Sequence, residues 1–338
     1  MAASPLSGSD SISTGSISQT ASPLPRIRMK APSRVADRVF YAVTCICALG
    51  IIVIVGLIVY ELVIHSEITL RQFGWKFFTG TNWDPVSGDF GALPFVFGTL
   101  VTSFVALAIA VPLAVGVAVY TTEMCPRPLR ASIAFCTELL AAIPSVVYGL
   151  WAMYILVPFL RTRVDPFLIK TLGWTGLFVA PDYGISLFSA SVILAVMVIP
   201  IISSITREVM ISVPQNQREA VLALGATRWE MIRLGVLRNA RAGILGAIIL
   251  GLGRALGETI AVSMVIGNNP QITKSLLAPG HAMATVIALE FSEAATPAYL
   301  SALVEIGLAL FLVTIVVNAA ARLLVWAVTH RMPARAHA

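Results

Sequence analysis

Two charged residues interrupt an apolar stretch of the sequence. Arg254 and Glu258 are four residues apart in GLGRALGETIAV, residues 251–262. In a helix this spacing places both side chains on one face. A guanidinium stays charged at every physiological pH and can hold two oxygens of an oxyanion at once, so Arg254 could line an anion path. The two charges could equally form a structural ion pair between helices, and the residues alone leave both interpretations open.

The surroundings of this pair suggest where it must lie. A charge at the centre of a membrane helix costs about 2.5–3.5 kcal/mol on insertion scales, so both side chains should face a bundle interior or a wet cavity. Gly253 and Gly257 alternate with them in a small-xxx-small pattern. That pattern predicts the close approach of a neighbouring helix.

Other residues that could do chemistry are isolated. Glu138 and Glu305 also lie in apolar stretches, where contacts that support helix packing are the simpler role, above all for Glu305. His65 and His281 have no candidate partners nearby in the sequence, and the four cysteines show neither a disulfide nor a zinc-ligand pattern. We therefore predict no catalytic residue, no metal site and no cofactor.

The elements that carry these residues are predicted to be membrane helices. The chain of 338 residues is 57% hydrophobic and only 12% charged, far from the composition of a soluble domain. Its apolar runs approach the roughly 20 residues that a helix needs to cross the hydrocarbon, and lipid admits only helices or closed barrels. The sequence thus predicts an all-α, polytopic membrane protein with six transmembrane helices. The predicted spans are 39–62, 92–120, 132–159, 185–206, 242–267 and 300–328.

Several features qualify or orient these spans. Pro112, Pro144, Pro158 and Pro200 lie in or near them and should kink or break some helices. Fifteen of the 23 Lys and Arg residues fall on one side of the predicted bundle and six on the other, which predicts that both termini are cytoplasmic. This topology also explains the basic composition, so we expect no nucleic-acid partner. Three tryptophans in the outer loops, Trp75, Trp83 and Trp174, are expected to anchor at the membrane interface.

The longest polar stretch on the cytoplasmic side, about 207–241, has a pattern of its own. Apolar residues lie on both sides of Gly225, a residue that can take a left-handed conformation and let the chain turn sharply. The pattern predicts two short amphipathic helices joined at this glycine.

The same stretch resembles the EAA loop of ABC importer permeases, because Glu219, Ala220 and Val221 are followed after three residues by Gly225. In that family the loop is the coupling helix that docks on a separate ATP-binding subunit. The sequence departs from the family pattern at Val221, in place of alanine, and at Arg238, in place of a proline. The resemblance implies that Glu219, Ala220 and Gly225 couple the chain to its ATPase, and no Walker A motif for ATP binding occurs in the chain itself.

Three segments are similar to the permeases of the bacterial Pst phosphate importer, of the PstC type. These are RALGETIAV at 254–262, ELLAAIPSVVYGLW at 138–151 and FFTGTNWDP at 77–85. The resemblance runs from about Arg38 to Arg331 and implies a type I ABC importer permease fold. It also implies a substrate path for inorganic phosphate that includes Arg254, Glu258 and Glu138.

The expected protein is therefore a multi-pass subunit of the inner membrane and not itself an enzyme. Its expected partners are an ATP-binding subunit, a second homologous permease of the PstA type, an external phosphate-binding protein, membrane lipid and phosphate. Two alternatives remain: a permease for another oxyanion such as sulfate or molybdate, and an ion-coupled secondary transporter that uses Glu138, Arg254 and Glu258 as a relay. The predicted organisation is a disordered cytoplasmic tail at 1–37, a membrane domain at 38–331 and a short cytoplasmic tail at 332–338.

Overall fold

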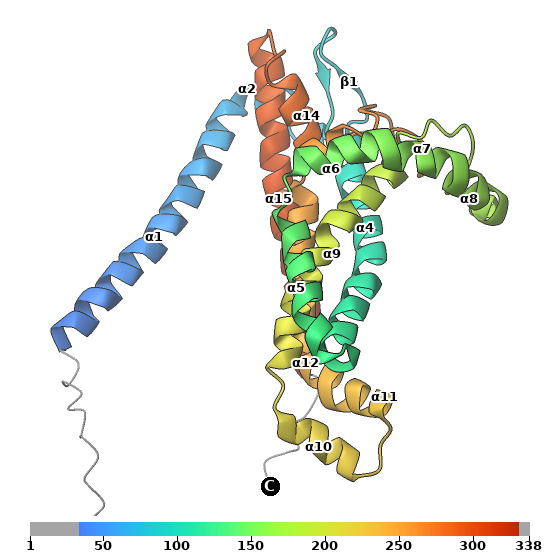
Figure 1. Ribbon diagram of the computed structural model, residues 1–338. Helices are drawn as coiled ribbons and strands as arrows, with labels where there is room; N and C mark the ends of the chain where they lie inside the picture. Colours follow the sequence, from blue (N-terminus) through green and yellow to red (C-terminus); the bar gives the residue numbers. More distant parts are fainter. Residues whose placement is uncertain (1–33, 331–338) are drawn as a thin grey trace, which may run out of the picture. The chain divides into compact units, whose positions relative to one another are not determined.

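The computed structural model describes residues 34–330 (Figure 1). Most of the predicted N-terminal tail and all of the predicted tail at 332–338 lie outside the described residues. Helix α1 begins at Arg34, inside the range 1–37 assigned to the tail. The chain divides into two units, one ending at Val55 and the other beginning at Gly56, and the following description concerns the second unit.

Long helices form the body of this unit and short elements connect them. The long helices are α4 (Leu93–Val119), α5 (Arg127–Ala142), α9 (Leu187–Ile211), α12 (Arg238–Gly257) and α15 (Pro297–His330). Helix α1 (Arg34–His65) begins in the first unit and ends in the second. The shorter helices are α2 (Glu67–Phe73), α3 (Lys76–Thr79), α6 (Ser145–Trp151), α7 (Val157–Phe159), α8 (Asp165–Leu172), α10 (Gln215–Ala223), α11 (Arg228–Glu230), α13 (Ile260–Ser263) and α14 (Met283–Glu290). Strands β1 (Trp83–Asp84) and β2 (Asp89–Phe90) pair as a small antiparallel hairpin.

Tight or wide helical turns extend several of these helices. They are the π-helical turns η1 (Tyr120–Met124), η2 (Ala152–Leu156), η3 (Leu160–Val164) and η5 (Met231–Leu237), and the 3-10 turn η4 (Gly173–Thr175). The turn η1 continues α4 without a break, and η5 leads without a break into α12. Both turns therefore lengthen apolar helices.

Six apolar helices within residues 34–330 are long enough to cross a membrane. They are Asp37–His65, Leu93–Met124, Ser145–Thr175, Leu187–Ile211, Arg228–Gly257 and Pro297–Ala327. Four of them agree with predicted spans to within about five residues at each end. The fifth, Arg228–Gly257, begins 14 residues and ends ten residues before the predicted 242–267. The predicted all-α class with six membrane helices is confirmed.

The third predicted span, 132–159, is wrong as one continuous helix. Helix α5 ends at Ala142, and Ile143 takes an extended conformation with a ψ of 130°. A residue that precedes a proline avoids the helical region, so Pro144 enforces the break and α6 starts anew at Ser145. Figure 1 shows α5 running alongside α9, whereas α6 to α8 turn away across the end of the bundle where α9 begins.

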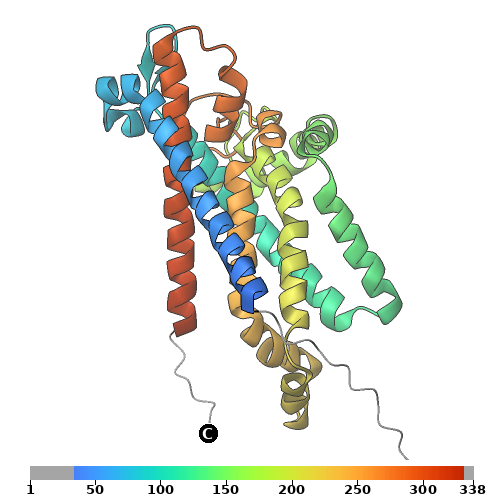
Figure 2. The ribbon, with the colours of Figure 1, turned by 90° about the vertical axis from the view of Figure 1, so that its left-hand side faces the viewer.

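Helix α9 is the centre of the bundle and packs against α4, α12 and α5 (Figures 1 and 2). Of its apolar stretch 61% is buried, compared with 33% for that of α4. Its first backbone amides, at Ser186, Leu187 and Phe188, donate to carbonyl groups of the 265–278 segment at 2.8–3.1 Å. The amide groups that a helix start leaves unpaired are thus satisfied by the loop that covers it.

Three apolar clusters follow one another along this unit. The central one joins α4, α6, α9, α12 and α13. A second lies between the hairpin, the start of α4, α14 and α15, and a third between the ends of α4 and α9 and the turn η5. Burial of these side chains holds together helices that lipid alone would not drive into contact.

Candidate functional site

Two of the three segments similar to Pst permeases meet in the fold, because α6 packs against α13. Gly149 permits this contact. A Cβ atom at Gly149 would lie 2.5 Å from Met264 Sδ and 3.1 Å from Ala261 Cα, so a larger residue would push the two elements apart. Residues 138–151 and 254–262 therefore form one structural neighbourhood.

Tyr148 closes the gap that Pro144 opens. Its hydroxyl donates to the carbonyl oxygen of Leu140 at 2.9 Å and so bridges the break between α5 and α6. Tyr148 lies in the segment 138–151 that is similar to Pst permeases, but the sequence does not predict that its hydroxyl bridges the break.

Arg254 and Glu258 do not share a helix, contrary to the prediction. Arg254 lies in the last turn of α12, which ends at Gly257, and Glu258 is extended with a ψ of 128° before α13 begins at Ile260. The helix therefore ends at Gly257, ten residues before the end of the predicted span 242–267. Arg254 Nη2 lies 4.0 Å from Glu258 Oε2, at the limit of an ion pair, and the arginine side chain is 40% exposed while the glutamate side chain is 9% exposed.

An arginine in the last turn of a helix also complements the negative end of the helix dipole. This placement reduces the cost of the charge that the sequence left unexplained. The guanidinium remains 40% exposed, so an anion can still reach it.

The predicted close approach at Gly253 and Gly257 is wrong within this chain. No described atom outside the helix lies within 4 Å of a Cβ placed at either glycine. Close packing occurs instead at Gly251, where a Cβ would lie 2.7 Å from Ile202 Cδ1 of α9, and at Gly243, where it would lie 2.4 Å from a methyl carbon of Val209. The contact face of α12 is therefore rotated from the one that the small-xxx-small pattern suggested.

Glu138 is engaged elsewhere. Arg207 of α9 donates from Nη2 to Glu138 Oε1 at 3.3 Å. Among residues 34–330, no hydrogen bond or ion pair joins Glu138 to Arg254 or Glu258. The structure therefore brings two of the three predicted path residues together. Arg207 lies 69 residues from Glu138 in the sequence, so no local sequence pattern predicts this pairing between α5 and α9.

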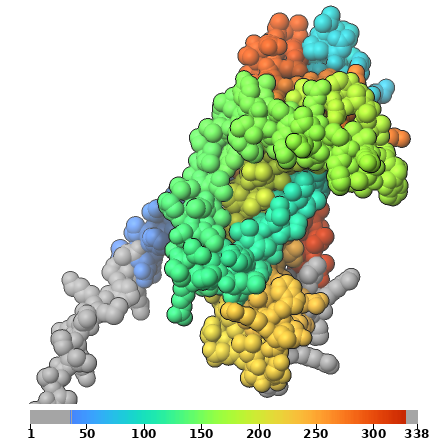
Figure 3. Space-filling view, turned by 45° about the vertical axis from the view of Figure 1, so that its right-hand side comes forward, coloured from blue at the N-terminus to red at the C-terminus, as the bar shows by residue number. Residues whose placement is uncertain are grey.

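The stretch 207–241 folds as two helices joined at Gly225, as predicted. Helix α10 ends at Ala223, Gly225 has a φ of +82°, and a capping box between Thr227 and Glu230 starts the next helix. The prediction placed the start of this stretch too early, because α9 continues to Ile211. Figure 3 shows α10 and α11 standing out from the end of the helices.

This element presents apolar side chains outward. Leu222, Leu224 and Trp229 are 45%, 89% and 61% exposed, while Met231 and Ile232 are buried in the cluster beneath. Glu219 and Ala220 are exposed as well. A protruding, partly apolar surface of this kind is typical of a protein-binding site.

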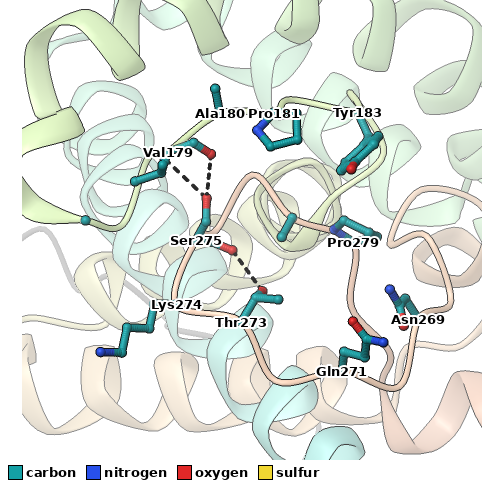
Figure 4. A pocket seen from close by; sticks show the side chains of 12 residues that line it. Val179, Ala180, Pro181, Tyr183, Asn269, Gln271, Thr273, Lys274, Ser275 and Pro279 are labelled. Atoms are coloured by element: carbon teal, nitrogen blue, oxygen red, sulfur yellow. Dashed lines mark hydrogen bonds between the residues drawn. The ribbon is translucent and has the colours of Figure 1, made fainter.

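The opposite end of the bundle carries an open pocket of about 670 Å³ between residues 176–183 and 269–279 (Figure 4). Ser275 fastens its two walls: the hydroxyl donates to Val179 O at 3.1 Å and accepts from Val179 N at 3.2 Å. Of the residues that line the pocket, Lys274 alone is charged. The lining therefore favours an anionic or neutral occupant over a cationic one.

A buried polar network stands beside it under the hairpin. Glu290 Oε2 accepts from Trp83 Nε1 at 3.0 Å and from Tyr299 Oη at 2.6 Å, and His281 Nε2 lies 3.9 Å from Glu290 Oε1. Trp83 is only 9% exposed, so the expectation of an interfacial anchor is wrong for this residue. Burial lowers the pKa of His281 to about 4, so its imidazole is neutral at physiological pH.

Comparison with known proteins identifies the family. Residues 110–331 match the model of the binding-protein-dependent transport system inner membrane component. The chain belongs to this family. Glu305, Arg254 and the stretch around Gly225 all lie within the matched residues.

Related proteins refine this assignment. The chain is 44% identical to the phosphate transport system permease protein PstC of Mesorhizobium japonicum, over 88% of this chain and 94% of that protein. It is 41% identical to the PstC protein of Haemophilus influenzae, over 86% of this chain and 93% of that protein. The predicted similarity to Pst permeases is thereby confirmed.

A solved structure agrees in fold. A bacterial ABC transporter involved in the import of the acidic polysaccharide alginate superposes with a TM-score of 0.55 at 17% identity, over 86% of this chain and 99% of that one. The type I ABC importer permease fold is confirmed, and the chain is a multi-pass protein of the inner membrane.

Proposed function

We propose that this chain is the permease subunit of an ATP-driven importer that carries inorganic phosphate across the inner membrane. The observation that carries the proposal is its similarity to PstC proteins over nearly the whole bundle. ATP hydrolysis takes place on a separate ATP-binding subunit, which docks on α10, Gly225 and α11. Glu219 and Ala220 form part of this docking surface.

Arg254 lies on the phosphate path and Glu258 orients its guanidinium. Support comes from the exposure of the arginine side chain and from the 4.0 Å separation of the pair, which leaves room for phosphate oxygens to compete. Glu138, held by Arg207, lines the path closer to the cytoplasmic end of α9.

The remaining partners follow from this arrangement. A second, homologous permease of the PstA type completes the path against the open face at Gly253 and Gly257. An external phosphate-binding protein docks at the end of the bundle that carries the hairpin and the pocket around Ser275. Both termini and the stretch 207–241 face the cytoplasm.

The test is uptake of radiolabelled phosphate by cells that lack other phosphate importers and express the complete complex. We expect ATP-dependent uptake that excess sulfate or molybdate does not inhibit. Inhibition by either oxyanion would assign the chain to that substrate instead. Uptake that collapses with a protonophore while ATP is maintained would favour the ion-coupled transporter.

A further inference from the structure

One arginine fastens the inner side of the proposed docking surface, which α10, Gly225 and α11 form. Arg218 lies on α10, directly before Glu219, and its side chain is 13% exposed. Its Nε and Nη2 atoms donate to Glu123 Oε1 at 3.3 and 3.1 Å. Nη1 and Nη2 also donate to the carbonyl oxygens of Val213 and Met210 at 2.5 and 2.8 Å.

These four hydrogen bonds join three elements. Glu123 belongs to η1, which continues α4, and its side chain is 9% exposed. Met210 lies in the last turn of α9, and Val213 lies two residues past its end at Ile211. Arg218 therefore links α10 to both α4 and α9, the two helices with the most extensive contact in the bundle.

A neighbouring residue makes a second link, toward α12. Asn239 Nδ2 donates to Gln217 Oε1 at 2.6 Å and to Gly235 O at 2.7 Å. Gly235 lets α10 approach η5 closely, since a Cβ there would lie 3.4 Å from both Gln217 O and Val221 Cγ2. Helix α12, which begins at Arg238, carries Arg254 at its other end.

The two sides of α10 thus have different contacts. Leu222 and Leu224 point outward and are exposed, whereas Arg218 is nearly buried against α4 and α9. A planar guanidinium with four hydrogen bonds resists sliding and rotation better than apolar contacts do. Movement of α10 must therefore pass into the helices to which Arg218 and Gln217 are bound.

We propose that Arg218 with Glu123, assisted by Gln217 with Asn239, is the joint that transmits movement of the docked ATPase from α10 to α4, α9 and α12. Arg218 is a positioning residue and touches neither substrate nor nucleotide. The inference rests on the proposed docking of an ATPase at α10. It adds which residues convert that docking into movement of the path.

The experiment uses the purified complex with its ATP-binding subunit in proteoliposomes. ATP hydrolysis is measured with and without the external binding protein loaded with phosphate, together with phosphate uptake. For Arg218→Ala, Glu123→Ala and the double variant, we expect uptake to fall at least about tenfold, because a nearly buried pair is broken. The stimulation of ATP hydrolysis by the loaded binding protein should be lost in all three to the same degree.

Three further sets of variants make the result specific. Arg127→Ala, which removes an exposed arginine at the start of the neighbouring helix α5, should retain stimulation and uptake. Exchange of the charges, Arg218→Glu with Glu123→Arg, should not restore coupling, because a carboxylate at position 218 would face the carbonyl groups of Met210 and Val213. Gln217→Ala and Asn239→Ala should each weaken stimulation without preventing assembly.

Wild-type stimulation in Arg218→Ala would overturn the proposal. Loss of the ATP-binding subunit from purified Arg218→Ala complexes would overturn it too, since that residue would then serve docking or folding. If the wild-type complex responds to another oxyanion instead of phosphate, the proposed substrate fails. The joint is then judged with the oxyanion that does stimulate hydrolysis.

Discussion

At the scale of single residues, Arg254 combines a fixed charge with incomplete pairing. Its guanidinium is 40% exposed and lies 4.0 Å from the only acid with which it pairs among the described residues. A structural ion pair buried in a membrane protein would normally be closer and more fully hydrogen-bonded. The geometry therefore favours a path residue over a helix lock.

The first prediction separates these roles. Arg254→Gln should abolish phosphate uptake while the complex still assembles, because glutamine keeps hydrogen-bond donors but loses the charge that phosphate requires. Exchange of the two charges, Arg254→Glu with Glu258→Arg, should not restore uptake. Wild-type uptake in a well-expressed Arg254→Gln protein would return the pair to a packing role; copurification with the ATP-binding subunit checks assembly.

The second prediction concerns His281 and pH. The pKa of the folded state is about 4 and that of an unfolded histidine about 6.5, so the unfolded state binds more protons between these values. The contribution of neutral His281 to the free energy of unfolding should therefore be fully present above pH 6.5 and fall as the pH decreases toward 4. The slope from this residue is at most about 1.4 kcal/mol per pH unit.

Thermal unfolding of the detergent-solubilised protein at pH 7 and pH 5 measures this effect. His281→Gln cannot titrate, so its unfolding temperature should depend less on pH than that of the wild type. An equal dependence in both proteins would assign the effect to groups other than His281.

The sequence predicts a functional residue only where that residue alone costs free energy, as a charge in a membrane helix does. Arg254 and Glu258 stood out because charges in an apolar run demand an explanation. Arg207, Arg218 and Tyr148 did not, because their roles depend on partners 69, 95 and 8 residues away. No local pattern records such pairings.

At the scale of elements, the turn at Gly225 is the feature that sequence predicted best. A φ of +82° is open to glycine and strained for residues with a Cβ, by about 1–2 kcal/mol. No atom of residues 34–330 lies within 4 Å of a Cβ placed there, so backbone strain is the main cost of substitution in this part of the chain.

The third prediction follows from this. Gly225→Val should straighten the turn, separate α10 from α11 and weaken binding of the ATP-binding subunit, with a loss of uptake. Gly225→Asn, which tolerates the left-handed region, should retain much of both. Copurification and uptake measure the outcome, and wild-type values for Gly225→Val would remove the coupling role from this turn.

Element boundaries were less accessible. Hydropathy is the same for a continuous helix and for an interrupted one. It therefore predicts 132–159 and 242–267 as one span each. Pro144 was a warning in the first case. In the second the break at Glu258 has no proline, and it is stabilised by tertiary contacts of α13 with α6 and α9.

At the scale of the whole molecule, the charge distribution predicts the orientation in the membrane. The fourth prediction tests it by cysteine labelling in a variant that lacks the four native cysteines. Val86→Cys, at the 97% exposed tip of the hairpin, should react with an impermeant reagent added to intact cells. Leu224→Cys should react only after permeabilisation, in cells without the ATP-binding subunit that would cover it. The reverse pattern would invert the topology.

The π-helical turn η5 has a consequence for how this protein can evolve. It leads without a break into α12, and α12 carries Arg254 in its last turn. Each residue of a helix turns the chain by about 100°, so inserting or deleting one residue in η5 would rotate every later side chain of α12 by that angle. Asn239 would then point away from Gln217, and Gly243 and Gly251 would no longer face Val209 and Ile202 of α9. Substitutions between Met231 and Gly257 can therefore accumulate far more readily than changes in length, and the number of residues from Gly225 to Arg254 should be the same in every functional relative.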